Sequence, residues 1–312
     1  MTSGLSLTVE DPGLLTTVQD LGRWGAQHYG VSVSGAMDRV SLRIANRLVG
    51  NRDQFAALEV TMAGPTIVFN TENQVAVSGA EFVLRLDDYL VSSDTLLTIH
   101  SGQRLSFGTR LSGARAYIAV AGGLDVEPVM GSCATHLPSK RGGLDGRPLR
   151  RGDDLRVGSF RGESIRPGSK LRWGRRFTGG TKVRVILGPQ AEWFSPDSID
   201  TLCSQRYRVG LTSDRMGYRM EGASIYRQFA TEMLSQAVSI GSIQVPPSGE
   251  LIVAMADCQT TGGYPKIATV ISADLHRLGQ LGPGDWLEFD ICDQPTARQA
   301  LCDLESMMVS SQ

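Results

Sequence analysis

The chain has 312 residues, of which 41% are hydrophobic and 20% charged, and its net charge is −1. This composition is typical of a folded protein of about two domains, and the charge balance excludes a general attraction to nucleic acid or acidic lipid. No apolar run approaches the roughly 20 residues that cross a bilayer, and the first residues lack a signal-peptide pattern. Five scattered cysteines, none in a C-x-x-C pair, favour a reducing compartment. We therefore expect a cytoplasmic protein.

Short β-like runs recur along the chain and predict a mainly β fold with short helices. They are rich in Val, Ile, Leu or Thr, and most are bounded by Gly, Pro, Asn or Asp, as in a barrel or sandwich. A tight turn followed by an alternating strand also recurs, beginning at Gly102, Gly152 and Gly284. The predicted strands span residues 57–63, 66–69, 74–77, 82–86, 96–99, 116–120, 182–187 and 251–256.

Three helices are also expected. Residues 36–48 carry apolar side chains three or four apart, and Gly50 lies just past their end. Ser195 before Pro196 is typical of a helix start. A last helix opens at Pro295. Its expected buried stripe consists of Ala297, Leu301, Leu304 and Met308.

The segment 161–180 is the best linker candidate, because it is rich in Gly, Ser, Pro and Arg and has little periodicity. We place the domain boundary within it, which predicts a first domain at residues 1–165 and a second at 166–312.

A polar motif near the N-terminus combines an amide, an acid and a cation within five residues. Gln19, Asp20 and Arg23 could bind a ureido or lactam group, which needs both donors and acceptors. Alternatively, Asp20 and Arg23 hold their own turn together. Ser34 and Gly35 precede the first predicted helix, whose N-terminus could receive a carboxylate or phosphate. The other interpretation is that Ser34 only caps this helix.

A second polar motif follows the run 251–256 and is shaped by Gly262 and Gly263. The arginine at position 215 could bind an anion or pair with a carboxylate across a sheet. The polar members of the motif are Asp257, Gln259, Thr260, Thr261, Tyr264 and Lys266.

Several common catalytic patterns are missing. There is no phosphate-binding P-loop, no G-x-S-x-G elbow and no Met-Lys-Met triplet of the kind that carries biotin. The four histidines are isolated, so no metal site is expected. Acid–base work would therefore fall to carboxylates, a phenol or an amine. These are Asp20, Asp38, Asp257, Tyr264 and Lys266.

Several motifs occur together in a familiar order. They include TTVQDLGR at 16–23, SGAMD at 34–38, ANRLVGN at 45–51, AYIAVAGG at 116–123, GYRMEG at 217–222, IQVP at 243–246 and QTTGGYPKIA at 259–268. The sequence resembles the family that includes the C subunit of bacterial 5-oxoprolinase. The same family contains allophanate hydrolase subunit 2-like proteins, the antagonist subunit of a sporulation-kinase inhibitor pair, and part of the carboxyltransferase region of urea carboxylase.

The resemblance implies two cyclophilin-like β-barrel domains and a multi-subunit enzyme. The first reaction that it implies is the ATP-dependent opening of 5-oxo-L-proline to L-glutamate. The expected partners are similar to the B and A subunits of 5-oxoprolinase, and the complex would use ATP and magnesium. The alternatives are carboxyl transfer to urea or a similar small amide, with biotin carried by another protein, and a regulatory role beside a partner that resembles the B subunit or a kinase inhibitor. A 312-residue chain without a biotin carboxylase segment favours the oxoprolinase. A stand-alone carbohydrate- or nucleotide-binding barrel is disfavoured, since aromatic residues make up only 6%.

Both motifs supply candidate site residues for this enzyme. The catalytic candidates are Asp257, Gln259, Tyr264 and Lys266. The substrate-binding candidates are Gln19, Asp20, Arg23, Ser34, Gly35, Asp38, Arg215, Thr260 and Thr261.

Overall fold

The computed structural model describes residues 6–159, 177–229 and 233–310, and the chain divides into two compact units. The predicted boundary between residues 165 and 166 lies outside the described residues. The chain leaves the first unit after Trp24 and returns to it at Ser34. The first unit comprises Met1–Trp24, Ser34–Phe177 and Ser311–Gln312, and the second comprises Gly25–Val33 and Thr178–Ser310.

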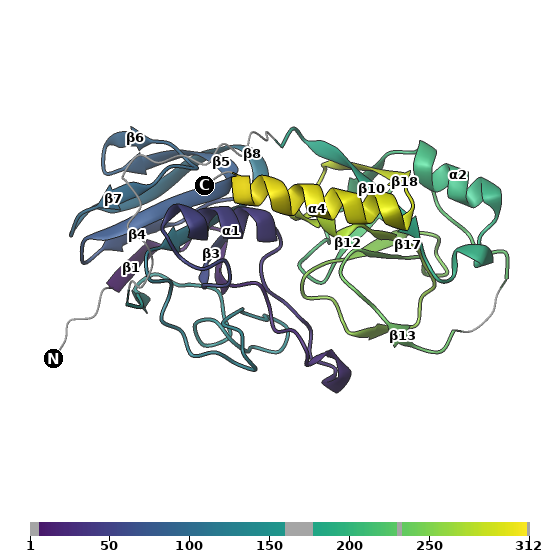
Figure 1. Ribbon diagram of the computed structural model, residues 1–312, viewed down its shortest axis with the longest axis horizontal. Coiled ribbons are helices and arrows are strands. Elements are labelled where there is room, and N and C mark those ends of the chain that lie inside the picture. The colour runs from purple at the N-terminus through teal and green to yellow at the C-terminus, as the bar shows by residue number, and fades with distance from the viewer. Residues whose placement is uncertain (1–5, 160–176, 230–232, 311–312) are drawn as a thin grey trace. The chain divides into compact units, whose positions relative to one another are not determined.

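The first unit contains a nine-stranded sheet within its described residues. Six strands follow the order β2-β3-β8-β4-β1-β9, and β5 pairs with β6, β7 and β8, every pair being antiparallel. Helix α1 (Arg39–Leu48) packs on β5 and β8 (Figure 1). The strands are β1 (Ser6–Asp11), β2 (Leu15–Gln19), β3 (Ala57–Thr61), β4 (Thr66–Phe69), β5 (Asn73–Leu86), β6 (Tyr89–Val91), β7 (Leu97–Ile99), β8 (Arg104–Val120) and β9 (Asp154–Arg156).

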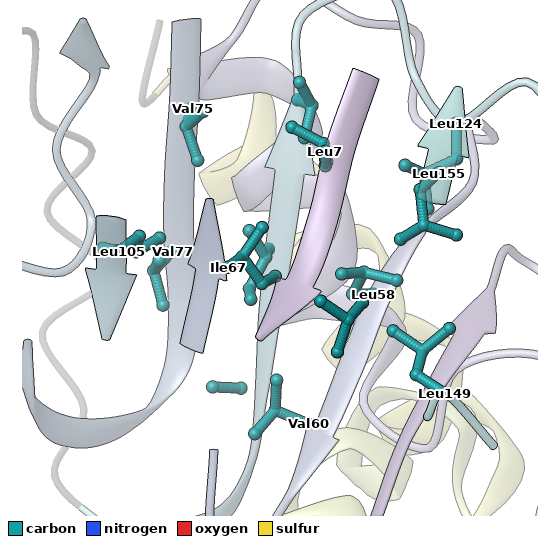
Figure 2. Packing of buried hydrophobic residues seen from close by; sticks show 14 of the residues in the cluster. Leu7, Leu58, Val60, Ile67, Val75, Val77, Leu105, Leu124, Leu149 and Leu155 are labelled. Atoms are coloured by element: carbon teal, nitrogen blue, oxygen red, sulfur yellow. The ribbon is translucent and has the colours of Figure 1, made fainter. Parts of the chain in front are cut away.

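One curved face of this sheet encloses an apolar core. Alternate residues of β1, β3, β4 and β5 point to the same side, as the period of two in a strand requires, and their side chains meet there (Figure 2). The sequence predicts two separate strands at 74–77 and 82–86, but they form the single strand β5. Gly79 has a φ of 102°, and the register shifts between Gly79 and Glu81. Gly79 is therefore accommodated in a bulge within the one strand.

The second unit is a closed barrel in the order β10-β17-β14-β15-β12-β11-β18. The barrel closes through the parallel pair β10–β18, and all its other pairs are antiparallel. A separate ribbon pairs β13 with β16. The mainly β fold is therefore confirmed. The strands are β10 (Gly180–Leu187), β11 (Tyr207–Val209), β12 (Gly217–Glu221), β13 (Gln236–Ala237), β14 (Ser242–Gln244), β15 (Leu251–Ala254), β16 (Thr261–Gly262), β17 (Lys266–Val270) and β18 (Trp286–Ile291).

The helical segments of the second unit are mostly short. Ser195 caps α2 by accepting from the amide of Ser198, as predicted. Helix α4 packs against β10 and η3 (Figure 1). The helical segments are η1 (Gln27–Tyr29), η2 (Ala191–Trp193), α2 (Pro196–Ser204), η3 (Ser272–Asp274), α3 (Leu275–Gly279) and α4 (Gln294–Ser310), of which η1 to η3 are single 3₁₀ turns.

The stripe predicted for α4 is wrong at two of its four residues, since Ala297 is only half-buried and Leu301 is exposed. Leu301 is 38% exposed, whereas Ala300, Leu304 and Met308 are buried. These three residues are four apart and form one narrow row on the helix, so the packed face is turned toward Ala300.

The three repeated turns are confirmed. Gly102, Gly152 and Gly284 have φ values of 87°, 85° and 89°. Each lies two residues before a strand, and each donates its amide to a carbonyl near the end of an earlier strand, at 2.7 to 2.8 Å. Glycine is favoured at all three positions because residues with a side chain rarely adopt this left-handed conformation.

Among the helices of the described residues, none has the length and apolar character needed to cross a membrane.

Candidate functional site

The N-terminal motif fastens a distant loop of the first unit. The buried carboxylate of Asp20 accepts from the hydroxyl of Ser132 and the amide of Cys133, both at 2.6 Å, and from the amide of Gly22 at 2.8 Å. Asp20 therefore does hold its own turn through Gly22. Its other two bonds reach more than 110 residues along the chain.

Arg23 makes the second half of this attachment. Its guanidinium is buried and donates to the carbonyl of Ala134, and it also donates to that of Val129 at 3.4 Å. Asp20 and Arg23 thus both bind the segment 129–135. These hydrogen bonds fix the position of the segment 129–135. Direct contact of Asp20 or Arg23 with a ligand stays a prediction.

Gln19 and Ser34 meet at one carbonyl. The Gln19 amide and the Ser34 hydroxyl both donate to the carbonyl of Thr135, each at 3.1 Å. Gln19 is fully buried at the end of β2, and its Oε1 has no hydrogen-bond partner among the described residues. A buried acceptor without a partner is costly, so Gln19 keeps one position where a donor would be stabilising.

The interpretation of Ser34 as a helix cap is wrong. Asp38 caps α1 by accepting from the amide of Ser41 at 2.9 Å and from its hydroxyl at 2.6 Å. Ser34 and Gly35 lie in a left-handed turn, with φ values of 58° and 88°, that brings the amide of Ala36 to the carbonyl of Asp20 at 2.8 Å. Because Asp38 already fills the first turn of α1, nothing in this geometry favours an anion there.

Replacing Gly35 by alanine is expected to destabilise the first unit. An added Cβ would lie 2.6 Å from the amide nitrogen of Gly22 and 2.9 Å from the carbonyl oxygen of Asp20. Left-handed strain and overpacking together cost about 2–4 kcal/mol, which chemical denaturation would measure. Gly102→Ala is the matched control, since Gly102 lies in the same unit and has a φ of 87° and no atom within 4 Å of the added Cβ. Equal losses in the two variants would contradict the steric explanation.

A buried tyrosine that the sequence analysis did not single out links α1 to the sheet. The hydroxyl of Tyr117 donates to Glu59 at 2.7 Å and accepts from the amide of Asp38 at 2.7 Å. Burial, and then the nearby Glu59 and Asp38 carboxylates, raise the pKa of Tyr117 well above its usual value. The phenol therefore stays protonated and acts as a structural donor. In the sequence, the one indication of this buried hydrogen-bonding role was a single tyrosine in the otherwise apolar run 116–120.

Asp94 lies before β7 and is expected to make stability depend on pH. Burial raises the pKa of Asp94 to about 6, partly offset by a hydrogen bond from Ser78. The folded chain then binds this proton more tightly than the unfolded chain, so the contribution of Asp94 to stability falls as pH rises from about 4 to about 6. Asp94→Asn should raise the free energy of unfolding at pH 7 by up to about 2 kcal/mol.

The measurement for Asp94 is denaturation between pH 4 and 7. Asparagine tolerates the φ of 51° found at this position, so the substitution tests the charge. Asp88→Asn, at an exposed side chain between β5 and β6, serves as the control. An unchanged pH profile in Asp94→Asn would refute the prediction.

The second motif begins with a buried ion pair in the second unit. Arg215 Nε donates to Asp257 Oδ2 at 2.9 Å, and its Nη2 donates to Oδ1 at 3.0 Å. The side chains are 7% and 1% exposed. Of the two interpretations of Arg215, this geometry favours pairing with a carboxylate, and it gives both Asp257 oxygens a structural partner.

Lys266 lies at the start of β17 in a ring of hydrogen bonds whose other members are uncharged. Its amide donates to Gln190 Oε1 at 3.1 Å, and Gln190 Nε2 donates to Gln236 Oε1 at 2.9 Å. The Lys266 ammonium then donates to the same Gln236 oxygen at 3.2 Å and to the carbonyl of Ala237 at 3.1 Å. Desolvation lowers the pKa of Lys266. Sequence reasoning missed Gln190 and Gln236, which lie outside every motif it recognised.

The rest of the motif forms an open loop. Thr260 is half-buried, Gln259 and Thr261 are exposed, and Tyr264 is 42% exposed. The ribbon β13–β16 holds the loop, with Gln236 opposite Gly262. These side chains are therefore available for binding beside Lys266. Among the described residues, no group of three or more His, Cys, Asp or Glu side chains is placed to hold a metal ion.

Comparison with known proteins places this arrangement in a family. A protein-family model described as "carboxyltransferase domain, subdomain A and B" matches residues 29–291 of the chain. The chain belongs to this family. The carboxyltransferase-domain chain is 42% identical to the 5-oxoprolinase C subunit of Escherichia coli over 293 residues, which cover 93% of each protein.

The carboxyltransferase-domain chain is also similar to parts of longer enzymes. It is 32% identical to the urea amidolyase of Lachancea kluyveri over 93% of this chain and 17% of that protein. The crystal structure of the Kluyveromyces lactis urea amidolyase matches 99% of this chain and 20% of its own, at a TM-score of 0.93 and 30% identity. The chain therefore spans about a fifth of that structure and nearly all of the E. coli protein.

Proposed function

We propose that the chain is the C subunit of an ATP-dependent 5-oxoprolinase that opens 5-oxo-L-proline to L-glutamate together with partner subunits. The similarity to the E. coli protein supports this proposal, because the two chains align over 93% of each. Similarity to the urea amidolyase covers only 17% of that protein. The identity is also higher to the E. coli protein, at 42%, than to the urea amidolyase, at 32%.

The second motif offers groups that suit a small planar amide. Gln259, Thr260 and Tyr264 can donate and accept hydrogen bonds, and Lys266 adds a cation. We assign contact with substrate to these residues and a supporting role to Asp257, whose carboxylate is held by Arg215. Within the first unit, Gln19 is a separate candidate for ligand contact, because its Oε1 has no partner among the described residues.

We propose that partners resembling the B and A subunits of 5-oxoprolinase complete the enzyme in the cytoplasm. ATP with magnesium is used at the level of the complex, where it supplies the energy that lactam opening requires. No residue of this chain is assigned to either group, since the described part of it contains no phosphate-binding loop and no metal-ligand cluster.

Carboxyl transfer to urea or a similar small amide is the second candidate function. The family model and the fold match to the K. lactis urea amidolyase favour it. Biotin would then be carried by another protein. A purely regulatory partner role is the third, and it requires only a binding surface.

The test is glutamate release from 5-oxoproline and ATP by extracts of cells with and without this gene. We expect the activity to disappear on deletion and to return with the wild-type chain. Unchanged release would refute the oxoprolinase proposal. Biotin-dependent use of ATP with urea in the same extracts would support the carboxyltransferase instead.

A further inference from the structure

Two amide side chains converge over Gly262. A Cβ added at Gly262 would lie 2.7 Å from Gln244 Nε2 and 3.1 Å from Gln259 Nε2. Gln244 is 5% exposed, and its Nε2 has no hydrogen-bond partner among the described residues. Both amides, with Val238 Cγ2 at 3.0 Å, therefore lie against the Gly262 backbone, and a side chain at position 262 would displace a buried donor that lacks an acceptor.

Lys266 belongs to the same patch of the barrel. The β14–β17 pairing sets Gln244 opposite Lys266, and directly paired residues of antiparallel strands point to the same face. The β13–β16 pairing sets Gln236 opposite Gly262, and Gln236 is an acceptor for the Lys266 ammonium. The Gln244 donor, the Gly262 backbone and the Lys266 ammonium are thus held by the paired strands β14–β17 and β13–β16.

The charge balance of this patch favours an anionic ligand. Lys266 is 6% exposed, and the acceptors of its ammonium are a carboxamide and a peptide carbonyl. Buried cations are ordinarily paired with carboxylates. In the same unit, Arg215 has Asp257 and Arg184 has Asp274 as partners. The patch instead offers one cation and several amide donors, which match the two oxygens of a carboxylate.

We propose that Lys266 and Gln244 form a subsite for the carboxylate of a small organic acid, with Gly262 lacking the side chain that would displace the Gln244 amide. Gln190 and Gln236 are positioning residues, because their hydrogen bonds link the Lys266 backbone to its ammonium. If the proposed function is correct, the carboxylate is that of 5-oxoproline. The subsite then orients the lactam ring through the end of the molecule that does not react.

The experiment compares L-5-oxoproline with L-5-oxoprolinamide, which has the same ring and a neutral carboxamide. Binding is measured by calorimetry on the full chain and on the assembled complex. We expect the wild type to prefer the acid by about tenfold or more, as a charge-assisted contact requires. Lys266→Gln should abolish this preference and Lys266→Arg should retain part of it. Gln244→Met should weaken binding of the acid several-fold.

Lys182→Gln is the control, because Lys182 is 52% exposed in the same barrel and pairs with Asp290 at 3.4 Å. It should leave the preference unchanged. Equal affinities for acid and carboxamide in the wild type would overturn the subsite, as would a preference that survives in Lys266→Gln or no binding of either compound. Because binding is read separately from glutamate release, a Lys266-dependent preference without turnover would refute the oxoprolinase alone. Turnover without the preference would refute the subsite alone.

Discussion

Lys266→Ala is expected to lower glutamate release by the assembled complex about a hundredfold or more and to leave the complex intact. The substitution removes the ammonium that we assign to the substrate carboxylate, and loss of substrate positioning can lower turnover about a hundredfold. The β17 backbone should persist, because the amide of residue 266 still donates to Gln190. Steady-state glutamate release and size-exclusion chromatography with the partner subunits measure the two effects.

The control and a second variant make this result decisive. Lys182→Ala removes an exposed lysine of the same barrel and should retain wild-type release. Gln259→Ala should also lower turnover without dissociating the complex. If Lys266→Ala and Gln259→Ala instead break the complex and change nothing else, the motif is a partner-binding surface and the regulatory role is favoured.

Asp257→Asn is expected to lower the free energy of unfolding of the barrel by about 3–5 kcal/mol. Arg215 and Asp257 are almost fully buried, and removing one charge leaves the other without compensation in a medium of low dielectric constant. Hydrogen exchange of the barrel amides is the suitable measurement, because a chain of two units need not unfold in one step.

Two further variants separate the ion pair from other causes. Combining Asp257→Leu with Arg215→Met should recover part of the loss, since no buried charge then remains. Asp290→Asn breaks the exposed pair with Lys182 and should cost less than about 1 kcal/mol. A loss within about 1 kcal/mol for Asp257→Asn would show that the pair contributes little.

Local signals in the sequence predicted local structure well. The strand at 66–69 and the helix start at Ser195 and Pro196 are found as predicted. The three repeated glycine turns are also present. Each of these features has a signal within a few residues of the position concerned, such as a run of β-branched residues, a serine before a proline, or a glycine. Where the local signal was ambiguous, the prediction failed. Ser34 resembles a cap, but Asp38 has the extended conformation that a cap requires.

The candidate site was predicted in part. Both motifs contain residues that take part in buried polar clusters, and residue types alone marked them as unusual. The partners of these residues could not be predicted. Asp20 and Arg23 bind a loop more than 100 residues away. Gln190 and Gln236, which hold Lys266, carry no local pattern that distinguishes them from the other glutamines of the chain.

The sequence by itself determined the mainly β class, the positions of the turns and the family to which the chain belongs. These depend on periodicity, on glycine and proline, and on the order of short motifs, all of which can be read along the chain. The tertiary structure decided which polar groups are already paired, such as Arg215 with Asp257, and which lack a partner, such as Gln244 Nε2 among the described residues. A hydrogen bond depends on distance in space, and only the folded chain brings together residues that are far apart in sequence.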